Sequence, residues 1–194
     1  MRSNLTLLPR AAILLFSLLL AGVAAEISVS AGAAPALKAG VFDPPRLAPE
    51  LSQVTLARYR GKVVLMAFGY TSCAAVCPIT LATLAQARST LGGAANAVQV
   101  IYVTVDPERD DADRMKEYLA EFDPSFIGAT GRPDALAAVR QSYGVTAVKI
   151  GTGDDYVMDH SSSIYLIDRA GRLRALMPYG HGDFVHDIKL LLAP

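Results

Sequence analysis

The chain has 194 residues, of which 52% are hydrophobic, a length and composition that suit one domain with a substantial core. Eighteen basic and eighteen acidic side chains cancel, so no overall field would attract nucleic acid or an anionic membrane surface. Trp is absent and aromatic residues make up only 7%, which gives no sign of a base-stacking or carbohydrate-binding surface. We therefore expect partners to be recognised locally.

The first 25 residues differ in composition from the rest of the chain. Arg2 and Arg10 precede an apolar run, and small residues at positions 23–25 follow it. This order predicts a signal peptide, or a short N-terminal anchor, over residues 1–25. The apolar stretch 11–25 is shorter than the roughly 20 residues that span a bilayer, so we favour cleavage over anchoring. We expect an exported protein, periplasmic or facing that side of the inner membrane, whose cysteines meet an oxidising compartment.

Residues 26–49 are rich in Ala, Gly and Pro and lack an apolar period, which indicates a linker before one domain over residues 50–194. Short, continuous apolar runs predict two strands buried on both faces of a parallel sheet, Val63 to Phe68 and Val98 to Val105. A helix is expected from about Cys77 to Leu91, where Gly92-Gly93 would end it.

The second half of the domain is expected to contain two helices, then two strands joined as a hairpin, and then a last helix. Two helices are expected, Asp110 to Phe122 and Pro133 to Tyr143. The strand-like runs Ser163 to Ile167 and Leu173 to Met177 are separated by a loop of hairpin length, and a last helix covers Asp183 to Leu192. This order predicts an α/β fold of three layers with a mixed central sheet.

Both cysteines lie in the segment Cys73-Ala74-Ala75-Val76-Cys77-Pro78, beyond the first strand and at the start of a helix. Open sheets place binding sites at this edge, and a helix amino terminus favours thiolate over thiol. A structural disulfide is the plain alternative for an exported protein. Cysteines four apart on a helix have Cβ atoms about 5 to 6 Å apart, whereas a relaxed disulfide needs about 3.5 to 4.5 Å. Two such thiolates can instead hold one soft ion such as Cu(I).

A third ligand would have to be His160, His181 or His186. His160 is the candidate, because Asp159-His160 comes directly before a predicted strand and after a Gly-rich, acidic loop at 151–155. His181 and His186 lie in or near the last helix, and we interpret them as solvated surface residues. The residues alone leave His160 undecided between a metal ligand and a histidine satisfied by hydrogen bonds.

The segment Asp106-Pro107-Glu108-Arg109-Asp110 follows the second buried strand, so it belongs to the same edge as the cysteines. Pro107 can fix a turn there, and Asp110 or Asp111 can cap the next helix. We favour this structural interpretation over a role in the site.

Taken in order, these motifs resemble the Sco/SenC family of copper-delivery proteins for cytochrome c oxidase assembly. The resemblance runs from about Phe42 to the end of the chain. It implies a thioredoxin-like fold in which Cys73, Cys77 and His160 bind copper, as Cu(I), Cu(II) or both, and pass it to the copper-containing subunit of a cytochrome c oxidase. Other exported copper chaperones and thiol reductants are further expected partners. The segments that carry the resemblance are Phe68 to Pro78, Val105 to Asp110, Asp159-His160-Ser161 and Tyr165 to Asp168.

In that fold the strand near Ser163 runs antiparallel to the strand ending at Gly69, so His160 could reach the cysteines. The rival interpretation is a thiol-disulfide oxidoreductase or redox sensor that uses Cys73 and Cys77 as a redox disulfide. Reductases that otherwise resemble this chain carry a cis-proline where Ser161-Ser162-Ser163 stands here, which argues against general reductase activity. The leading interpretation is therefore a binding protein rather than an enzyme.

The chain departs from the family pattern in two places. Asp111-Ala112 replaces the more usual Thr-Pro, and the segment between Pro49 and Gly61 is short. Neither change touches the proposed ligands. The sequence identifies no fourth ligand, and Met158 and Tyr102 have no assigned role.

Overall fold

The computed structural model describes residues 56–180 and 183–193. The expected leader 1–25, the linker 26–49 and His181 lie outside the described residues. Within the described part, we find no helix with both the length and the apolar character that crossing a membrane requires.

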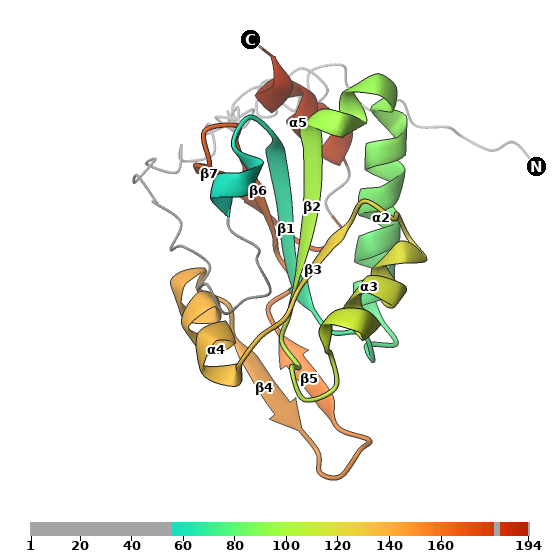
Figure 1. The fold of residues 1–194 in the computed structure, drawn as a ribbon, viewed down its shortest axis with the longest axis vertical. Helices are drawn as coiled ribbons and strands as arrows, with labels where there is room; N and C mark the ends of the chain where they lie inside the picture. The colour runs from blue at the N-terminus through green and yellow to red at the C-terminus, as the bar shows by residue number, and fades with distance from the viewer. Residues whose placement is uncertain (1–55, 181–182, 194) are drawn as a thin grey trace, which may run out of the picture. The chain divides into compact units, whose positions relative to one another are not determined.

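A five-stranded sheet in the order β3-β2-β1-β6-β7 organises the described domain (Figure 1). β1 (Val63–Gly69) and β2 (Val98–Thr104) pair in parallel, and every residue of both strands is buried. β3 (Ile127–Ala129) pairs in parallel with β2. β6 (Ile164–Ile167) runs antiparallel to β1, and β7 (Leu173–Met177) runs antiparallel to β6. The sheet is mixed, as predicted.

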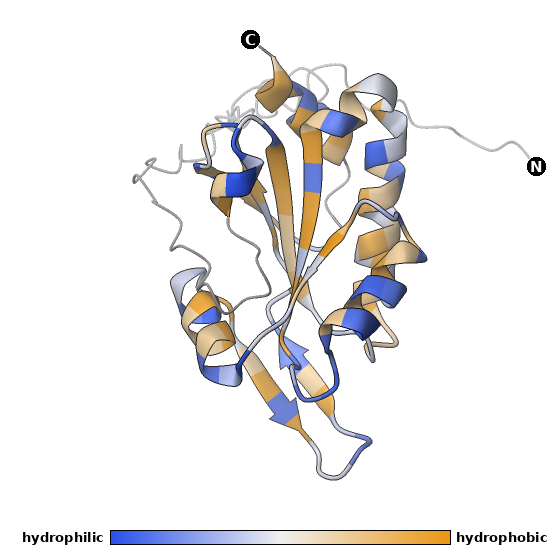
Figure 2. Ribbon diagram, in the orientation of Figure 1, coloured by the Kyte–Doolittle hydropathy of each residue, from blue (hydrophilic) through white to orange (hydrophobic). Residues whose placement is uncertain are grey.

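Helices cover both faces of this sheet (Figure 1). α2 (Val76–Thr90) and α3 (Ala112–Ala120) lie on one side, because both are crossovers between parallel strands and such crossovers share one hand. α5 (Phe184–Leu192) packs against α2, and α4 (Pro133–Ser142) lies on the other side. The three predicted layers are therefore confirmed. Figure 2 shows why they hold together, since β1 and β2 are hydrophobic along most of their length whereas the helices carry polar bands.

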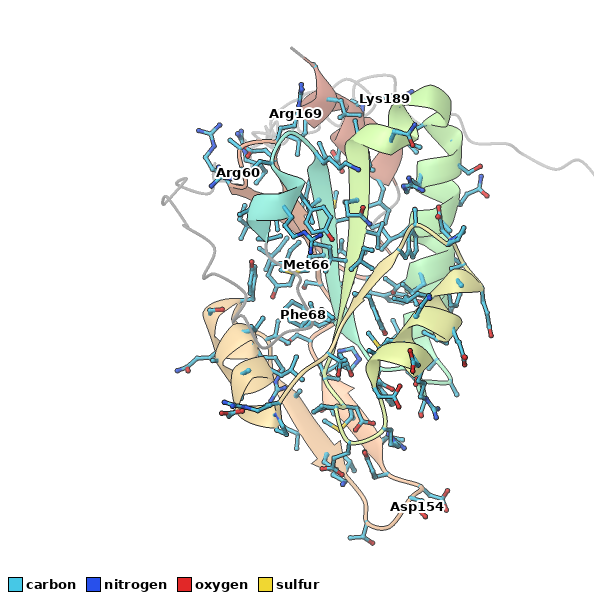
Figure 3. The ribbon with its side chains drawn as sticks, in the orientation of Figure 1. Arg60, Met66, Phe68, Asp154, Arg169 and Lys189 are labelled. Atoms are coloured by element: carbon cyan, nitrogen blue, oxygen red, sulfur yellow. The ribbon has the colours of Figure 1, made fainter. Side chains whose placement is uncertain are left out.

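The sheet packs on both sides because its central strands have no polar face. Met66 and Phe68 stand two residues apart on β1 and point to the same face (Figure 3). The Phe68 ring meets the Tyr165 ring edge-on, with 5.6 Å between centroids, and lies 5.9 Å from the Tyr143 ring. Aromatic contacts of this kind stabilise the layer between the sheet and the chain segment that follows α4.

The sequence analysis missed a two-stranded sheet formed by β4 (Ala147–Ile150) and β5 (Val157–His160). The two strands form an antiparallel hairpin, and the acidic loop expected at 151–155 is its turn, with Asp154 at the tip (Figure 3). His160 is the last residue of β5, not a loop residue before the next strand. These strands are short and largely exposed, so they lack the continuous apolar run that revealed β1 and β2.

Two short 3-10 helices complete the described residues. η1 (Leu56–Tyr59) precedes β1, and η2 (Gly92–Ala97) follows α2. α2 ends at Thr90, one residue before the predicted end, and Gly92 then takes a φ of 54°, a left-handed conformation that favours glycine. The chain turns there into η2 rather than into an open loop.

Candidate metal and thiol site

The candidate site lies where β1 and β2 both end, next to the β4–β5 hairpin (Figure 1). Cys73 lies in the loop between β1 and α2, and Cys77 is the second residue of α2. The amide of Val105 donates a 2.8 Å hydrogen bond to the carbonyl oxygen of Gly69, which ties the two strand ends together. The expected antiparallel pairing of β6 with β1 is confirmed, and it returns the chain after His160 to this same edge.

His160 contacts the buried cysteine directly. Its Nε2 atom lies 3.7 Å from Cys77 Sγ, and its Nδ1 atom lies 2.9 Å from the carbonyl oxygen of Ser161. Because a carbonyl oxygen only accepts hydrogen bonds, we place the proton on Nδ1 and the free lone pair on Nε2, facing the sulfur. The Tyr70 ring meets the His160 ring edge-on at 5.9 Å and covers it on one side. The imidazole is therefore held with Nε2 facing the Cys77 sulfur.

The two thiols differ in character, although both are free. Cys77 is only 3% exposed, and burial raises the pKa of its thiol to about 12. Partial burial opposes ionisation of Cys73 too, but hydrogen bonds from the backbone of Ala75 and from the Cys77 side chain outweigh it and lower the pKa of Cys73. Cys73 is thus the better thiolate, and Cys77 holds its proton until something replaces it.

The described residues contain no group of three or more His, Cys, Asp or Glu side chains arranged to hold a metal ion as they stand. Cys77 contacts His160, and Cys73 is linked to Cys77 by a side-chain hydrogen bond. A three-donor site built from these residues would therefore need the Cys73 loop or the His160 ring to move.

Tyr102 reaches the site from β2. Its side chain is 1% exposed, and its hydroxyl makes no well-aligned hydrogen bond to any described residue. A Cβ atom added at Gly69 would overlap this hydroxyl and would lie 2.9 Å from Cys77 Sγ. Gly69 thus leaves the space in which the hydroxyl and the sulfur lie side by side, and the nearby hydroxyl opposes the burial that raises the pKa of Cys77.

Asp110 anchors the loop that carries Cys73. Its side chain has no exposed surface, and it accepts hydrogen bonds from the Thr71 amide at 3.1 Å, the Thr71 hydroxyl at 2.6 Å and the Thr104 hydroxyl at 2.7 Å. The sequence analysis offered Asp110 or Asp111 as the cap of α3. Asp111 is the cap, since its carboxylate accepts from the Arg114 amide at 2.8 Å. Asp110 instead joins the ends of β1 and β2.

Asp106 and Arg109 do more than form the turn that the sequence analysis favoured. The Asp106 carboxylate, 3% exposed, accepts from Arg109 Nε and from the Tyr156 hydroxyl, both at 2.6 Å. The guanidinium lies 3.7 Å above the Tyr156 ring and also donates to the Asp154 carbonyl oxygen at 3.2 Å. Asp106, Arg109 and Tyr156, called here the hairpin clamp, therefore fasten the strand that carries His160 to the end of β2.

Two further candidates, Met158 and His186, remain. Met158 is partly buried, shares a face of β5 with His160 and lines a cavity of about 170 Å³ with Asp106 and Lys149. His186 is exposed on α5, as predicted.

Known proteins are similar to this chain in sequence and in fold. Residues 49–190 match the SCO1/SenC family. The mitochondrial SCO2 homolog of mouse is 40% identical over 119 residues, which are 59% of this chain and 47% of that protein, so this chain spans about half of its relative. Copper-bound ScoI of Bradyrhizobium japonicum is 40% identical with a TM-score of 0.67, covering 72% of this chain and 90% of ScoI.

A third relative links the fold to redox behaviour. BsSco, in which a disulfide switch has been identified, is a member of the Sco family of cytochrome c oxidase assembly proteins. It is 25% identical with a TM-score of 0.57, and the match covers 72% of this chain and 86% of BsSco. Together these structures confirm the predicted thioredoxin-like fold.

Proposed function

This chain belongs to the SCO1/SenC family, and we propose that it is a copper chaperone that binds one copper ion through Cys73, Cys77 and His160. We further propose that it delivers the ion to the copper-containing subunit of a cytochrome c oxidase. The observation that carries the proposal is the 3.7 Å contact between Cys77 Sγ and His160 Nε2, from residues 83 positions apart. The copper bound by ScoI and the assembly role of BsSco support it.

The donors suit copper as a cargo. Thiolate sulfur is a soft ligand that favours Cu(I), and imidazole suits copper in both common oxidation states. Cys73 has a lowered pKa, so it ionises more readily than an ordinary cysteine, and His160 presents an unprotonated nitrogen. Cys77 must lose its proton when the ion binds. Copper affinity should therefore fall as the pH falls. Cys73 is partly exposed, so a ligand from the recipient can approach the ion on that side.

We place this chemistry outside the cytoplasm. The proposed leader or anchor over residues 1–25 and the linker 26–49 would present the domain 50–194 on the periplasmic side of the inner membrane. Other exported copper chaperones and thiol reductants would then be its partners, because the site must be loaded and its thiols kept reduced.

A second candidate function is thiol-disulfide exchange or redox sensing through a Cys73–Cys77 disulfide. The unequal thiols favour it, since a thiolate at Cys73 could attack a disulfide and Cys77 could then resolve the mixed disulfide. The disulfide switch of BsSco supports this candidate as well. Both functions could use the same pair at different times.

A copper titration of the reduced protein separates the two functions. We would compare the wild type with Cys73→Ser, Cys77→Ser and His160→Ala, using the exposed His186→Ala as the matched control. Copper delivery predicts one tightly held ion, lost in either cysteine variant and unchanged in His186→Ala, with Cu(II) weakened more than Cu(I) in His160→Ala. An absence of stoichiometric copper, together with rapid disulfide exchange, would establish the second function instead.

A further inference from the structure

We propose that the Tyr102 hydroxyl donates a hydrogen bond to the Cys77 sulfur when that sulfur binds copper, and that this bond favours Cu(I) over Cu(II). The inference rests on the proposed function. Tyr102 would act through Cys77 without touching the ion, so it is a positioning residue that tunes the site.

The first observation is a buried hydroxyl whose hydrogen bonding is incomplete. Tyr102 is 1% exposed, and its hydroxyl makes no well-aligned hydrogen bond to any described residue. It interacts with the Cys77 side chain in a poorly aligned hydrogen bond. Buried tyrosine hydroxyls usually find a good partner, because leaving one unpaired loses its hydration without compensation. The hydroxyl would therefore gain most from a change that makes the Cys77 sulfur a stronger acceptor.

The second observation is that the Tyr102 hydroxyl lies beside Cys77, whose sulfur can change from thiol to thiolate. A Cβ atom at Gly69 would overlap the Tyr102 hydroxyl and would lie 2.9 Å from Cys77 Sγ, so the hydroxyl and the thiol share one space. Parallel pairing of β1 with β2 sets this arrangement by placing Tyr102 opposite Ala67, two residues before Gly69. A tyrosine hydroxyl carries its proton at neutral pH, so it is available as a donor to the sulfur beside it.

Copper binding changes the acceptor strength of this sulfur. A neutral thiol is a weak acceptor, whereas a thiolate carries negative charge and accepts a shorter, stronger hydrogen bond. A hydrogen bond to a metal-bound cysteine sulfur draws electron density away from the metal and is one way in which proteins tune copper potentials. Because Cu(II) depends more on that density than Cu(I) does, the Tyr102 bond favours the reduced ion.

Tyr118 on α3 provides a matched control. Its hydroxyl is also buried without a well-aligned partner among the described residues. Burial and the charges of Cys77 and Cys73 raise the pKa of Tyr118, but no hydrogen bond joins it to either sulfur. Tyr118→Phe therefore removes the same atom from the same neighbourhood without removing the proposed bond.

The test compares wild type, Tyr102→Phe and Tyr118→Phe, after circular dichroism and thermal melting have shown that all three are folded. Cu(I) and Cu(II) dissociation constants are measured by competition with chelators of known affinity. We expect Tyr102→Phe to shift the ratio of the two constants about tenfold towards Cu(II), or about 59 mV for a one-electron couple. The thiolate-to-Cu(II) absorption band should move to lower energy. Tyr118→Phe should match the wild type.

A wild-type ratio in Tyr102→Phe, or an equal shift in Tyr118→Phe, would overturn the inference. A mercuric ion, which binds neighbouring thiols as a dithiolate, gives a copper-free readout. The difference Raman spectrum between wild type and Tyr102→Phe should then show a tyrosine hydroxyl that donates a stronger hydrogen bond in the mercuric form than in the dithiol form. If the wild type takes up no copper, the proposed function fails, and the mercuric spectra alone support or refute the hydrogen bond.

Discussion

Removal of the Asp110 carboxylate should test how the cysteine loop is held. Asp110→Ala deprives three donors of their acceptor: the amide and hydroxyl of Thr71 and the hydroxyl of Thr104. Thr104 has no exposed surface, and the Thr71 amide is fixed by the loop, so neither can turn to water. Only the Thr71 hydroxyl can rotate towards solvent. Two donors left unpaired, at about 1–3 kcal/mol each, predict a loss of about 2–6 kcal/mol in the free energy of unfolding.

Urea denaturation followed by circular dichroism measures this loss, and the neighbouring Asp111→Ala is the control. Asp111 caps α3 through the Arg114 amide, and removal of such a cap costs about 1 kcal/mol. Asp110→Ala should therefore cost at least twice as much as Asp111→Ala, although both remove one carboxylate from adjacent positions. A loss this large is a substantial fraction of the about 5–15 kcal/mol that stabilises a typical domain.

Loss of the Asp110 carboxylate should also loosen the loop that carries Cys73. Hydrogen exchange of the Thr71 and Cys73 amides should quicken more in Asp110→Ala than exchange within β2. Equal costs for the two aspartate variants would refute the assignment of unpaired donors. A large cost with unchanged exchange in the loop would show that Asp110 stabilises the domain without positioning the loop.

At pH 8 iodoacetamide should modify Cys73 at least about a hundredfold faster than Cys77, since Cys77 is buried and its thiol has a pKa of about 12. Mass spectrometry of the Cys77→Ser and Cys73→Ser variants gives the rate of each remaining thiol. Equal rates would contradict the assigned thiol characters. Tyr156→Leu removes a hydrogen bond to a charged group, which contributes about 1.5–3 kcal/mol, and a cation–π contact, which contributes about 0.5–2 kcal/mol. The rate of amide exchange in β4 and β5 should therefore rise at least about tenfold relative to that in β1. Tyr156→Phe, which keeps the ring, should have a smaller effect. Unchanged exchange in both variants would show that the hairpin clamp does not hold the hairpin in place. Burial opposes ionisation of Asp168, but its hydrogen bonds to Arg172 and Arg174 outweigh burial and lower its pKa. The stability that the ionised Asp168 gives the folded protein is therefore present above its unfolded pKa near 4, and it is lost as the pH falls through the folded pKa. Asp168→Asn should accordingly reduce the free energy of unfolding at pH 7 by about 1–3 kcal/mol, and the difference from wild type, measured by urea titration, should shrink on acidification rather than grow.

The elements predicted well are those whose physical cause is local. β1 and β2 appear as continuous apolar runs because helices cover both faces of the sheet, and β7 was predicted with its observed bounds. β3 was missed because it has three residues, one of them Gly128, and pairing with β2 alone defines it. The β4–β5 hairpin was missed because each strand has only four residues, and Val148, Ile150 and Val157 are each more than half exposed.

The site shows the same division between local and distant causes. Spacing and helix position singled out Cys73 and Cys77. A position just before a predicted strand singled out His160 over His186, and the family resemblance then implied that His160 binds copper. The supporting residues could not be found in this way, because their roles depend on strand register. Tyr102 reaches Cys77 only because β2 pairs in parallel with β1 in one register, and Tyr156 meets Asp106 across 50 residues of chain. No pattern within a short window of sequence records such a contact.

Each of the three proposed copper donors is held by a different kind of structure, and this bears on how an ion could leave. Cys77 is fixed in the core at the start of α2, whereas Cys73 lies in a partly exposed loop anchored by Asp110. His160 belongs to the two-stranded β4–β5 sheet. Among the described residues, no strand pairing joins this sheet to the five-stranded sheet. Ligand exchange proceeds most readily when one donor can withdraw while the others stay in place. The hairpin is held to the segment after β2 by the hairpin clamp and by the exposed Lys149–Glu108 ion pair, so we expect His160 to release first and Cys77 last.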